Sequence, residues 1–515
     1  MATDTPPPTA GMKKTLGLTG VTVNAMALIA PGAFLWITYQ VQAAQTLPGS
    51  GASTALDMFP GIVFALVLAF FTAFSYSELA RIYPEAGTGS CYYFAERSFL
   101  DKLNAAHHRW ARPAKLATGW AAHLFYWVYP GVMVSFMAIL VSYLLQQFGL
   151  NIGMIGQLVV AGVFSILVGF IAIRGVTGST TTSLVINVIQ LVTLVGFSAV
   201  AVAYRMLNPD HATFAFASAP AVVLPKDLFS VFSQATIAIL ILVGFESATA
   251  FGAEAKNAKR DVPRAVILAL VIQGLFAYLI EYFAANDALS DKLVGTDAAG
   301  KAISGMTAAA ASSAPIGDLI KQIGDTMLGG LGFPLMVVVA VTVALAILGT
   351  TLSAMNTGVR ITYAMAQDEE MPGLLGLLHG RFATPHIAVV VLVIVSGLIG
   401  MIGTLSVVTL TGITLASNFG TFVLYALTCL IAVNAFLGRA DFRFVKHAVV
   451  PILGFLANMV MLITIFALGF MGGGDSQTES FMALGFAGVW LVASVAYVAL
   501  RRRPPARAVP ERTTA

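Results

Sequence analysis

The chain has 515 residues, of which 58% are hydrophobic and only 10% are charged, and its formal net charge is +4. Soluble globular domains carry about 25% charged residues, so this composition excludes a soluble globular protein and indicates a polytopic membrane protein. The small positive balance does not indicate nucleic-acid binding, because the cations cluster in segments that flank apolar spans. The two cysteines, Cys91 and Cys429, provide neither a disulfide framework nor a zinc site, and we expect no cofactor.

Twelve apolar segments are long enough to cross a bilayer, whose hydrocarbon core of about 30 Å needs roughly 20 apolar residues in a helix. The sequence therefore predicts an all-α polytopic membrane protein with 12 transmembrane helices. In chain order the predicted spans are 17–43, 58–80, 116–147, 153–173, 179–204, 228–252, 263–286, 330–363, 386–404, 408–436, 446–471 and 480–500.

Lysine and arginine decide the orientation of these spans. With a cytoplasmic N-terminus, five of the 28 Lys and Arg residues lie in external segments and the other 23 face the cytoplasm. This asymmetry follows the positive-inside rule. We therefore expect a multi-pass protein in the lipid bilayer of the inner (cytoplasmic) cell membrane, with both termini cytoplasmic. The five external cations are Arg205, Lys226, Lys292, Lys301 and Lys321.

Two spans carry a break in their helical pattern. In the first span the break is Ala30–Phe34, where Pro31 lacks a backbone donor and the adjacent Gly32 has low helix propensity. In the sixth span the candidate break is Val243-Gly244-Phe245-Glu246. In hydrocarbon an unsatisfied backbone group costs several kcal/mol, so a broken helix survives only where protein, water or a ligand replaces the lost bonds. Two such breaks, five helices apart, are typical of a transporter with a binding site near the membrane midplane.

The two longest connections are expected to contain elements of their own. Arg81–Lys115 carries charges and a tryptophan, which predicts an amphipathic helix along the inner membrane surface. Asn286–Leu331 is rich in small residues and external, and we expect a short helix there, over the outer side of the bundle.

Three motifs, in an order and topology that extend over most of the chain, resemble the amino acid–polyamine–organocation superfamily of permeases. They are Tyr76–Leu79 with Pro84–Ser90, Gly244–Glu246 with Glu254–Pro263, and Asn356–Asp368 with Thr384-Pro385.

The resemblance implies a LeuT-type core of two inverted five-helix repeats, residues 17–204 and 228–436, with helices 1 and 6 unwound at the midplane. Two further C-terminal helices then occupy 446–500, and residues 1–16 and 501–515 are cytoplasmic tails. The resemblance also places residues 30–34 at the family's Gly-Ser-Gly-(Ile/Val)-Phe signature.

The peptide groups freed by these breaks suit a zwitterion. Amides at the start of the second half of helix 1, with the positive end of its dipole, suit a carboxylate. Carbonyls at the end of the first half, and in helix 6, suit an ammonium group. Pro31 offers no amide hydrogen, so Gly32 and Ala33 are the expected donors and a decarboxylated amine becomes an alternative substrate. The alternative role for Pro31 is to kink a packed helix.

Polar and aromatic side chains near the breaks complete the predicted substrate site. Glu246 is an intramembrane carboxylate that could bind a substrate ammonium, exchange protons, or make a structural hydrogen bond that holds the break. Tyr126 and Phe245 are candidate aromatic gates or ordinary core residues, and Asn418 either lines the pathway or joins two helices. The predicted substrate-binding residues are Ile29, Ala30, Pro31, Gly32, Ala33, Phe34, Tyr126, Val243, Gly244, Phe245, Glu246 and Asn418.

The coupling ion is not fixed by the sequence. Some members of the superfamily that this chain resembles have a lysine in helix 5, where its ammonium takes the place of a sodium ion. The corresponding position in this chain is at or near Gln190. A neutral amide cannot replace a cation, so coupling through such a lysine is not expected, and proton and sodium both stay open. Thr350, Thr351 and Ser353 could supply oxygen ligands to sodium, although hydroxyls also satisfy helix carbonyls with no ion present.

Charged side chains in the inner loops predict an ion network that breaks when an inner gate opens. The alternative is that they are solvated loop ends that set the topology. Together with Glu246 and Gln190, the predicted coupling and gating residues are Glu78, Glu254, Lys256, Arg264, Arg360 and Asp368.

These patterns favour a secondary transporter that moves an amino acid or a closely related amine across the cytoplasmic membrane by alternating access. A polyamine or organic-amine exchanger is the nearest alternative. A membrane enzyme is not expected, because no span carries paired His, Asp or Glu residues at metal-ligand spacing. A permease-fold sensor usually needs an appended signalling domain. We expect a monomer or homodimer whose partner is a small-molecule substrate.

Overall fold

The structure is a computed structural model and describes residues 14–29, 35–47, 50–84, 89–174, 180–209, 218–252, 254–297, 299–382 and 384–500. Among these residues, eleven helical segments are long and apolar enough to cross a membrane, and they coincide with predicted spans two to twelve. The first predicted span is described as two helices, α1 (Leu18–Ile29) and α2 (Leu35–Ala44), and the residues between them lie outside the description.

The membrane-spanning segments are built from long α-helices, some of which continue into 3-10 or π turns. They are α3 (Met58–Ile82), α5 (Ala111–Gln147), α6 (Gly153–Ile173), α7 (Thr180–Leu207), α9 (Leu228–Ala238) with η4 (Ile239–Ile241) and η5 (Phe245–Phe251), α10 (Ala258–Leu270) with η6 (Val271–Tyr278) and α11 (Leu279–Ala288), α14 (Gly332–Gln367), α15 (His386–Gly403), α16 (Val407–Phe436), η8 (Val445–Val449) with α17 (Val450–Met471), and α18 (Gly474–Leu500).

Shorter elements connect them. These are η1 (Ala55–Asp57), α4 (Cys91–Leu100), η3 (Ala105–Trp110), α8 (Ala219–Val223), the antiparallel hairpin of β1 (Val294–Thr296) and β2 (Ala302–Ser304), α12 (Gly305–Ala311), α13 (Pro315–Met327) and η7 (Gly373–Gly376).

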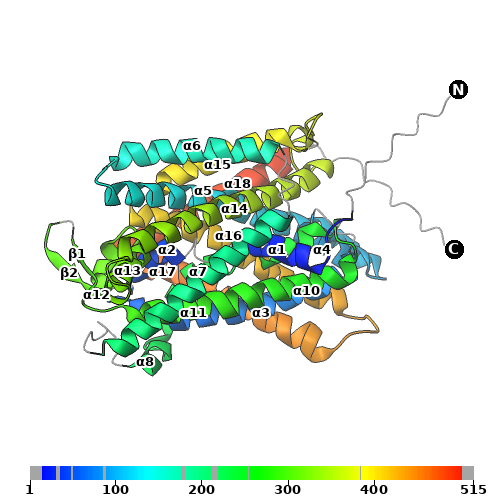
Figure 1. Cartoon of the computed structure of the whole chain (residues 1–515). Helices are drawn as coiled ribbons and strands as arrows, with labels where there is room; N and C mark the ends of the chain where they lie inside the picture. Colours follow the sequence, from blue (N-terminus) through cyan, green and yellow to red (C-terminus); the bar gives the residue numbers. More distant parts are fainter. Residues whose placement is uncertain are drawn as a thin grey trace.

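The long helices lie side by side, and the short elements gather at the two ends of the bundle (Figure 1). The hairpin, α12, α13 and α8 lie at one end, where α12 and α13 pack on α2. Helix α4 lies at the other end and packs on α5. Helices are therefore present in both connections where the sequence predicts them, whereas the hairpin was not predicted.

Two helices, α5 and α16, form the centre of the bundle. α5 packs against α14, α15 and α16, and α16 also packs against α17 and α18. A helix that is apolar on all sides belongs in such a buried position. The peripheral helices instead expose large apolar side chains, such as Ile166 on α6 and Val492 on α18. An exposed apolar surface of this extent suits contact with lipid rather than water.

Three helices begin at least five residues earlier than predicted: α5, α18 and α10, which begins at Ala258 rather than at 263. In α5 and α18 the first turns are polar but have partners. α5 begins at Ala111 rather than at 116, and its Lys115 ammonium lies 2.7 Å from the Glu96 carboxylate. α18 begins at Gly474 rather than at 480, and its Glu479 accepts a hydrogen bond of 2.8 Å from Gln45. Hydropathy alone ends a span at its first charges, whereas partnered charges continue the helix.

Candidate functional site

The sixth span is interrupted inside the bundle. The α-helix ends at Ala238, a single 3-10 turn follows, and a turn over Leu242–Gly244 separates it from η5. Gly244 has φ +136°, a conformation that side chains disfavour. A Cβ atom on this residue would lie 2.9 Å from the backbone nitrogen of Ile29. The interruption predicted at Val243-Gly244 is therefore present, and it lies against the end of α1.

Glu246 holds this turn to two other helices. Its Oε2 atom accepts hydrogen bonds from the Gly244 amide (3.0 Å) and from the Tyr425 hydroxyl of α16 (2.8 Å). Its Oε1 atom accepts one from the Tyr126 hydroxyl of α5 (2.9 Å). The carboxylate is buried and, among the described residues, all its partners are neutral. It caps the broken backbone, and none of its described partners is a cation.

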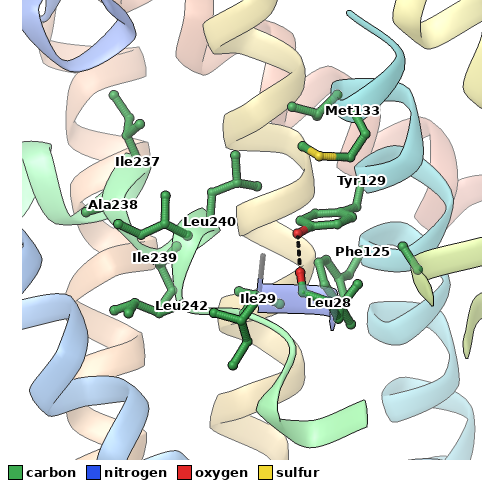
Figure 2. Close-up of a cluster of buried hydrophobic side chains, with 14 of the residues drawn as sticks. Leu28, Ile29, Phe125, Tyr129, Met133, Ile237, Ala238, Ile239, Leu240 and Leu242 are labelled. Atoms are coloured by element: carbon green, nitrogen blue, oxygen red, sulfur yellow. Dashed lines mark hydrogen bonds between the residues drawn. The ribbon is translucent and has the colours of Figure 1, made fainter. Parts of the chain in front are cut away.

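The last carbonyls of α1 each accept a hydroxyl from a different helix. Thr350 of α14 donates to the Ala27 carbonyl at 3.1 Å, and Tyr278 of η6 donates to the Ile29 carbonyl at 2.8 Å. Between them, Tyr129 of α5 donates to the Leu28 carbonyl at 3.3 Å, as Figure 2 shows. Within the described residues these carbonyls accept side-chain hydroxyls, and the C-terminal end of a helix carries the negative end of its dipole. This end of α1 is therefore suited to a cationic group.

The side chains around this point are apolar. Figure 2 shows Ile237, Leu240 and Leu242 of the sixth span, with Phe125 and Met133 of α5, around the end of α1. All of them are buried. A small solute bound beside the broken backbone would thus meet polar backbone groups at one end and apolar side chains around the rest of its surface.

Of the predicted substrate-binding residues, the structure describes seven and brings most of them together. Ile29, Val243, Gly244, Phe245, Glu246 and Tyr126 lie in one buried region, and the Phe245 ring lies 5.4 Å from that of Tyr425. Asn418 donates instead to the Thr236 carbonyl of α9 at 2.7 Å, which ties α16 to the first half of the sixth span. Ala30, Pro31, Gly32, Ala33 and Phe34 lie outside the described residues, and their role stays a prediction.

Three tyrosines of this region were not predicted from the sequence. Tyr129, Tyr278 and Tyr425 are all buried and hydrogen-bonded to α1 or to Glu246. The available signal was a tyrosine in the interior of an otherwise apolar span, because a buried hydroxyl needs a partner.

The predicted coupling residues occupy separate places. Gln190 of α7 is buried, but the contact with α1 is made by its neighbour Asn187, which donates to the Val23 carbonyl at 3.3 Å and accepts from Gln273. The Thr351 hydroxyl donates to Ile347 of its own helix. Thr350 reaches α1, as described above, whereas Ser353 is half-buried on α14.

The predicted inner network divides into clusters. Arg360 pairs with Glu254 at 2.9 Å, while Lys256 and Arg264 are exposed. Two further clusters lie apart from this pair: Asp368 is 2.9 Å from Lys115, which also pairs with Glu96, and Glu78 pairs with Arg81, Lys446 and His447.

Arg360 attaches the end of the interrupted span to α14. Besides its ion pair with Glu254, its guanidinium donates to the Ala250 carbonyl at 3.2 Å and lies 5.1 Å from the centre of the Phe251 ring. Cys91, at the start of α4, lies beside the Tyr76 hydroxyl on the same side of the site. Burial raises the pKa of the Cys91 thiol to about 12, so it is unreactive while this side is closed.

Arg360→Gln is expected to raise the rate at which a maleimide labels Cys91. Loss of a partly exposed ion pair costs about 1 kcal/mol, which shifts an opening equilibrium about fivefold. Labelling is read by mass spectrometry of the purified protein. Cys429, buried against Ser75 of α3 and Gly454 of α17, is the internal control and should stay unlabelled. Equal labelling of Cys91 in variant and wild type would contradict a gating role for Arg360.

The fold and site define a multi-pass membrane protein in which one buried, apolar span is interrupted inside the bundle. The sequence profile of the amino acid permease family matches residues 14–493. The chain belongs to this family, which confirms the resemblance to the amino acid–polyamine–organocation superfamily.

The chain is similar to transporters with different named substrates. The chain is 26% identical over 483 residues to the branched-chain amino acid permease BcaP of Lactococcus lactis, and 88% of each chain is covered. It is 23% identical over 483 residues to the BcaP of Bacillus subtilis, with 89% of each covered. It is also 25% identical over 225 residues to the low-affinity putrescine importer PlaP of Escherichia coli, with 43% of this chain and 44% of PlaP covered.

Proposed function

We propose that this protein is a secondary transporter that carries an amino acid with an apolar side chain across the cytoplasmic membrane. The observation that carries the proposal is the buried turn at Leu242–Gly244, held against the end of α1 and capped by Glu246. Broken helices inside a membrane bundle expose peptide groups that bind substrate in several transporter folds. We infer transport by alternating access of two five-helix repeats, residues 17–204 and 228–436.

The substrate ammonium is assigned to the space between Glu246 and the end of α1. Both present negative charge there, the first as a carboxylate and the second as the dipole end with its carbonyls. The substrate carboxylate is assigned to the amides of Gly32 and Ala33, as the sequence predicts.

The substrate side chain is assigned to the apolar group around Leu240, Phe125 and Met133, because transfer of a branched aliphatic chain from water to apolar surroundings is favourable. The similarity to BcaP along nearly the whole of both chains supports this assignment.

A polyamine or organic-amine exchanger is the second candidate. The carboxylate of Glu246 and the similarity to PlaP over part of the chain favour it. A diamine such as putrescine carries a second ammonium, and placing that charge among Leu240, Phe125 and Met133 would be costly. An apolar amino acid fits these residues better.

We propose an orientation with both termini cytoplasmic and in the inner membrane, as a monomer or homodimer. The excess of Lys and Arg in the predicted inner segments supports it. The hairpin, α12 and α13 are then external, and the clusters of Glu78, Arg360 and Asp368 are cytoplasmic gate contacts.

Uptake by proteoliposomes tests the substrate. Labelled isoleucine is expected to enter in a saturable manner, and unlabelled valine or leucine should compete while putrescine at the same concentration should not. Liposomes without protein give the background. Saturable entry of putrescine with no entry of isoleucine would favour the second candidate, and no flux of either would contradict the assigned substrate class.

A further inference from the structure

A second intramembrane carboxylate, Glu281 of α11, lies outside the site described above. Its side chain is only 2% exposed. Within the described part of the chain, neither of its carboxylate oxygens has a hydrogen-bond partner. Glu246 is also buried in this bundle, but it accepts three hydrogen bonds. Burial alone therefore does not explain why no described donor reaches Glu281.

A small cavity adjoins this carboxyl group. Its volume is about 10 Å³, the space of one water-sized sphere. Its walls are mostly apolar and come from four helices: Leu35 of α2, Phe197 of α7, Ile316 of α13, and α11 itself. Ser198 of α7 is the other polar side chain among its described walls, and its hydroxyl donates to the Leu194 carbonyl of its own helix.

Neighbouring titratable groups are engaged elsewhere. On α11 and η6, Tyr282 donates to Gln42 and Tyr278 donates to the Ile29 carbonyl. The other titratable or charged groups on the four helices around this cavity also have partners. The hydrogen-bonded pairs are Tyr39 of α2 with Asn286, Tyr204 of α7 with Gln322, Asp318 of α13 with Tyr143 and Ser312, Lys321 of α13 with Gln147, and Asp325 of α13 with the Gly332 amide. Arg205 of α7 and Asp287 of α11 attract each other by charge.

We propose that Glu281 is a proton-binding site that must be occupied before the external side of the transporter closes over its substrate. An unpaired carboxylate ion in apolar surroundings is unstable unless it is neutralised. A metal cation needs about six oxygen ligands, and the described walls offer one carboxyl group and one engaged hydroxyl. A proton needs none of these ligands, so it is the ion that this site takes.

The position of the site links proton binding to closure. Leu35 is the first residue of α2, which follows the predicted binding segment 30–34 directly, and Ile316 belongs to α13, which packs on α2. Water reaches the carboxyl group only when α2 or α13 moves away from α7 and α11. The proton therefore binds or leaves with these helices apart, and the closed arrangement holds it. This inference rests on the proposed function, since it names the ion that controls the transport cycle.

The test uses the full-length protein with Ile316→Cys as a reporter and a membrane-impermeant maleimide added from outside. The labelling rate at each pH is divided by that of the same cysteine in the denatured protein, because the thiolate fraction of the reporter itself increases with pH. With Glu281 intact, this ratio is expected to increase with external pH, by up to about tenfold per pH unit for a single proton. Glu281→Gln and Glu281→Met do not titrate at this position, and their ratio is expected to stay low at every pH. Methionine suits the apolar walls, so this variant carries the test if the glutamine variant does not fold.

A matched control separates this site from other buried carboxylates. Glu479 of α18 is buried but accepts a hydrogen bond from Gln45, and Glu479→Gln should keep the pH profile of the intact protein. Unchanged pH dependence in both Glu281 variants would overturn the proposal, as would a flat profile in the protein with Glu281 intact. The labelling experiment needs no substrate. Absence of isoleucine uptake would therefore contradict the proposed substrate without changing the conclusion drawn from the labelling of the reporter.

Discussion

Gly244→Ala is expected to abolish transport and to lower the melting temperature of the protein. The φ of +136° disfavours any side chain, at a cost of roughly 1–3 kcal/mol. The new Cβ would also lie 2.9 Å from both the backbone nitrogen and the Cγ1 of Ile29, and forcing such a contact costs about 1–3 kcal/mol more. These costs are large beside a total stability of about 5–15 kcal/mol.

Uptake in proteoliposomes and thermal unfolding in detergent measure the two effects. Gly488→Ala in α18 is the matched control, because its new methyl group would meet no atom within 4 Å. This control should transport normally and unfold at the same or a slightly higher temperature, since alanine is the better helix former by about 0.5–1 kcal/mol. Normal uptake by Gly244→Ala would show that the turn is not the place where substrate binds.

Glu246→Gln is expected to keep the fold and to weaken substrate binding about 10- to 150-fold. The amide oxygen can accept from the Gly244 amide and Tyr425, and the amide nitrogen can donate to the Tyr126 oxygen, so every contact has a replacement. What is lost is the charge, and a hydrogen bond to a charged group is worth about 1.5–3 kcal/mol.

A second variant, Glu246→Ala, distinguishes the effect of the side-chain charge from the effect of its hydrogen bond to the broken backbone. It leaves the buried Gly244 amide without its acceptor, at about 1–3 kcal/mol, so its melting temperature should fall below that of the glutamine variant. Binding is measured by the ligand-induced rise in melting temperature. Wild-type affinity in Glu246→Gln would assign this residue to structure alone, and an unchanged melting temperature in Glu246→Ala would contradict its role as a cap.

The sequence predicts the parts of this protein that depend on local pattern. Spans two to twelve follow from apolar length, and the turn at Val243-Gly244 follows from a glycine placed before a carboxylate within an apolar run. Membership of the permease family follows from motif order. The boundaries of α5 and α18 were predicted too short, because their polar first turns are stabilised by partners far away in the chain.

The contacts of the site could not be predicted in the same way. Tyr129 and Tyr278 are 101 and 249 residues away from the carbonyls that they bind. Each is one polar residue in an apolar helix, and which face of the helix it occupies depends on the packing. The ion pairs of the inner loops could not be predicted for the same reason. Side chains of opposite charge occur in several neighbouring loops, and the sequence does not show that Arg360 pairs with Glu254 while Asp368 pairs with Lys115.

The hydroxyls of Thr350, Tyr129 and Tyr278 also have a kinetic consequence. They come from three separate helices, and all three fasten consecutive carbonyls of α1. Any tilt of α1 must release them almost simultaneously, and each bond contributes about 0.5–1.5 kcal/mol. Rearrangement then has few half-released intermediates. Turnover should accordingly slow steeply on cooling, because the barrier is dominated by the enthalpy of bonds that break together.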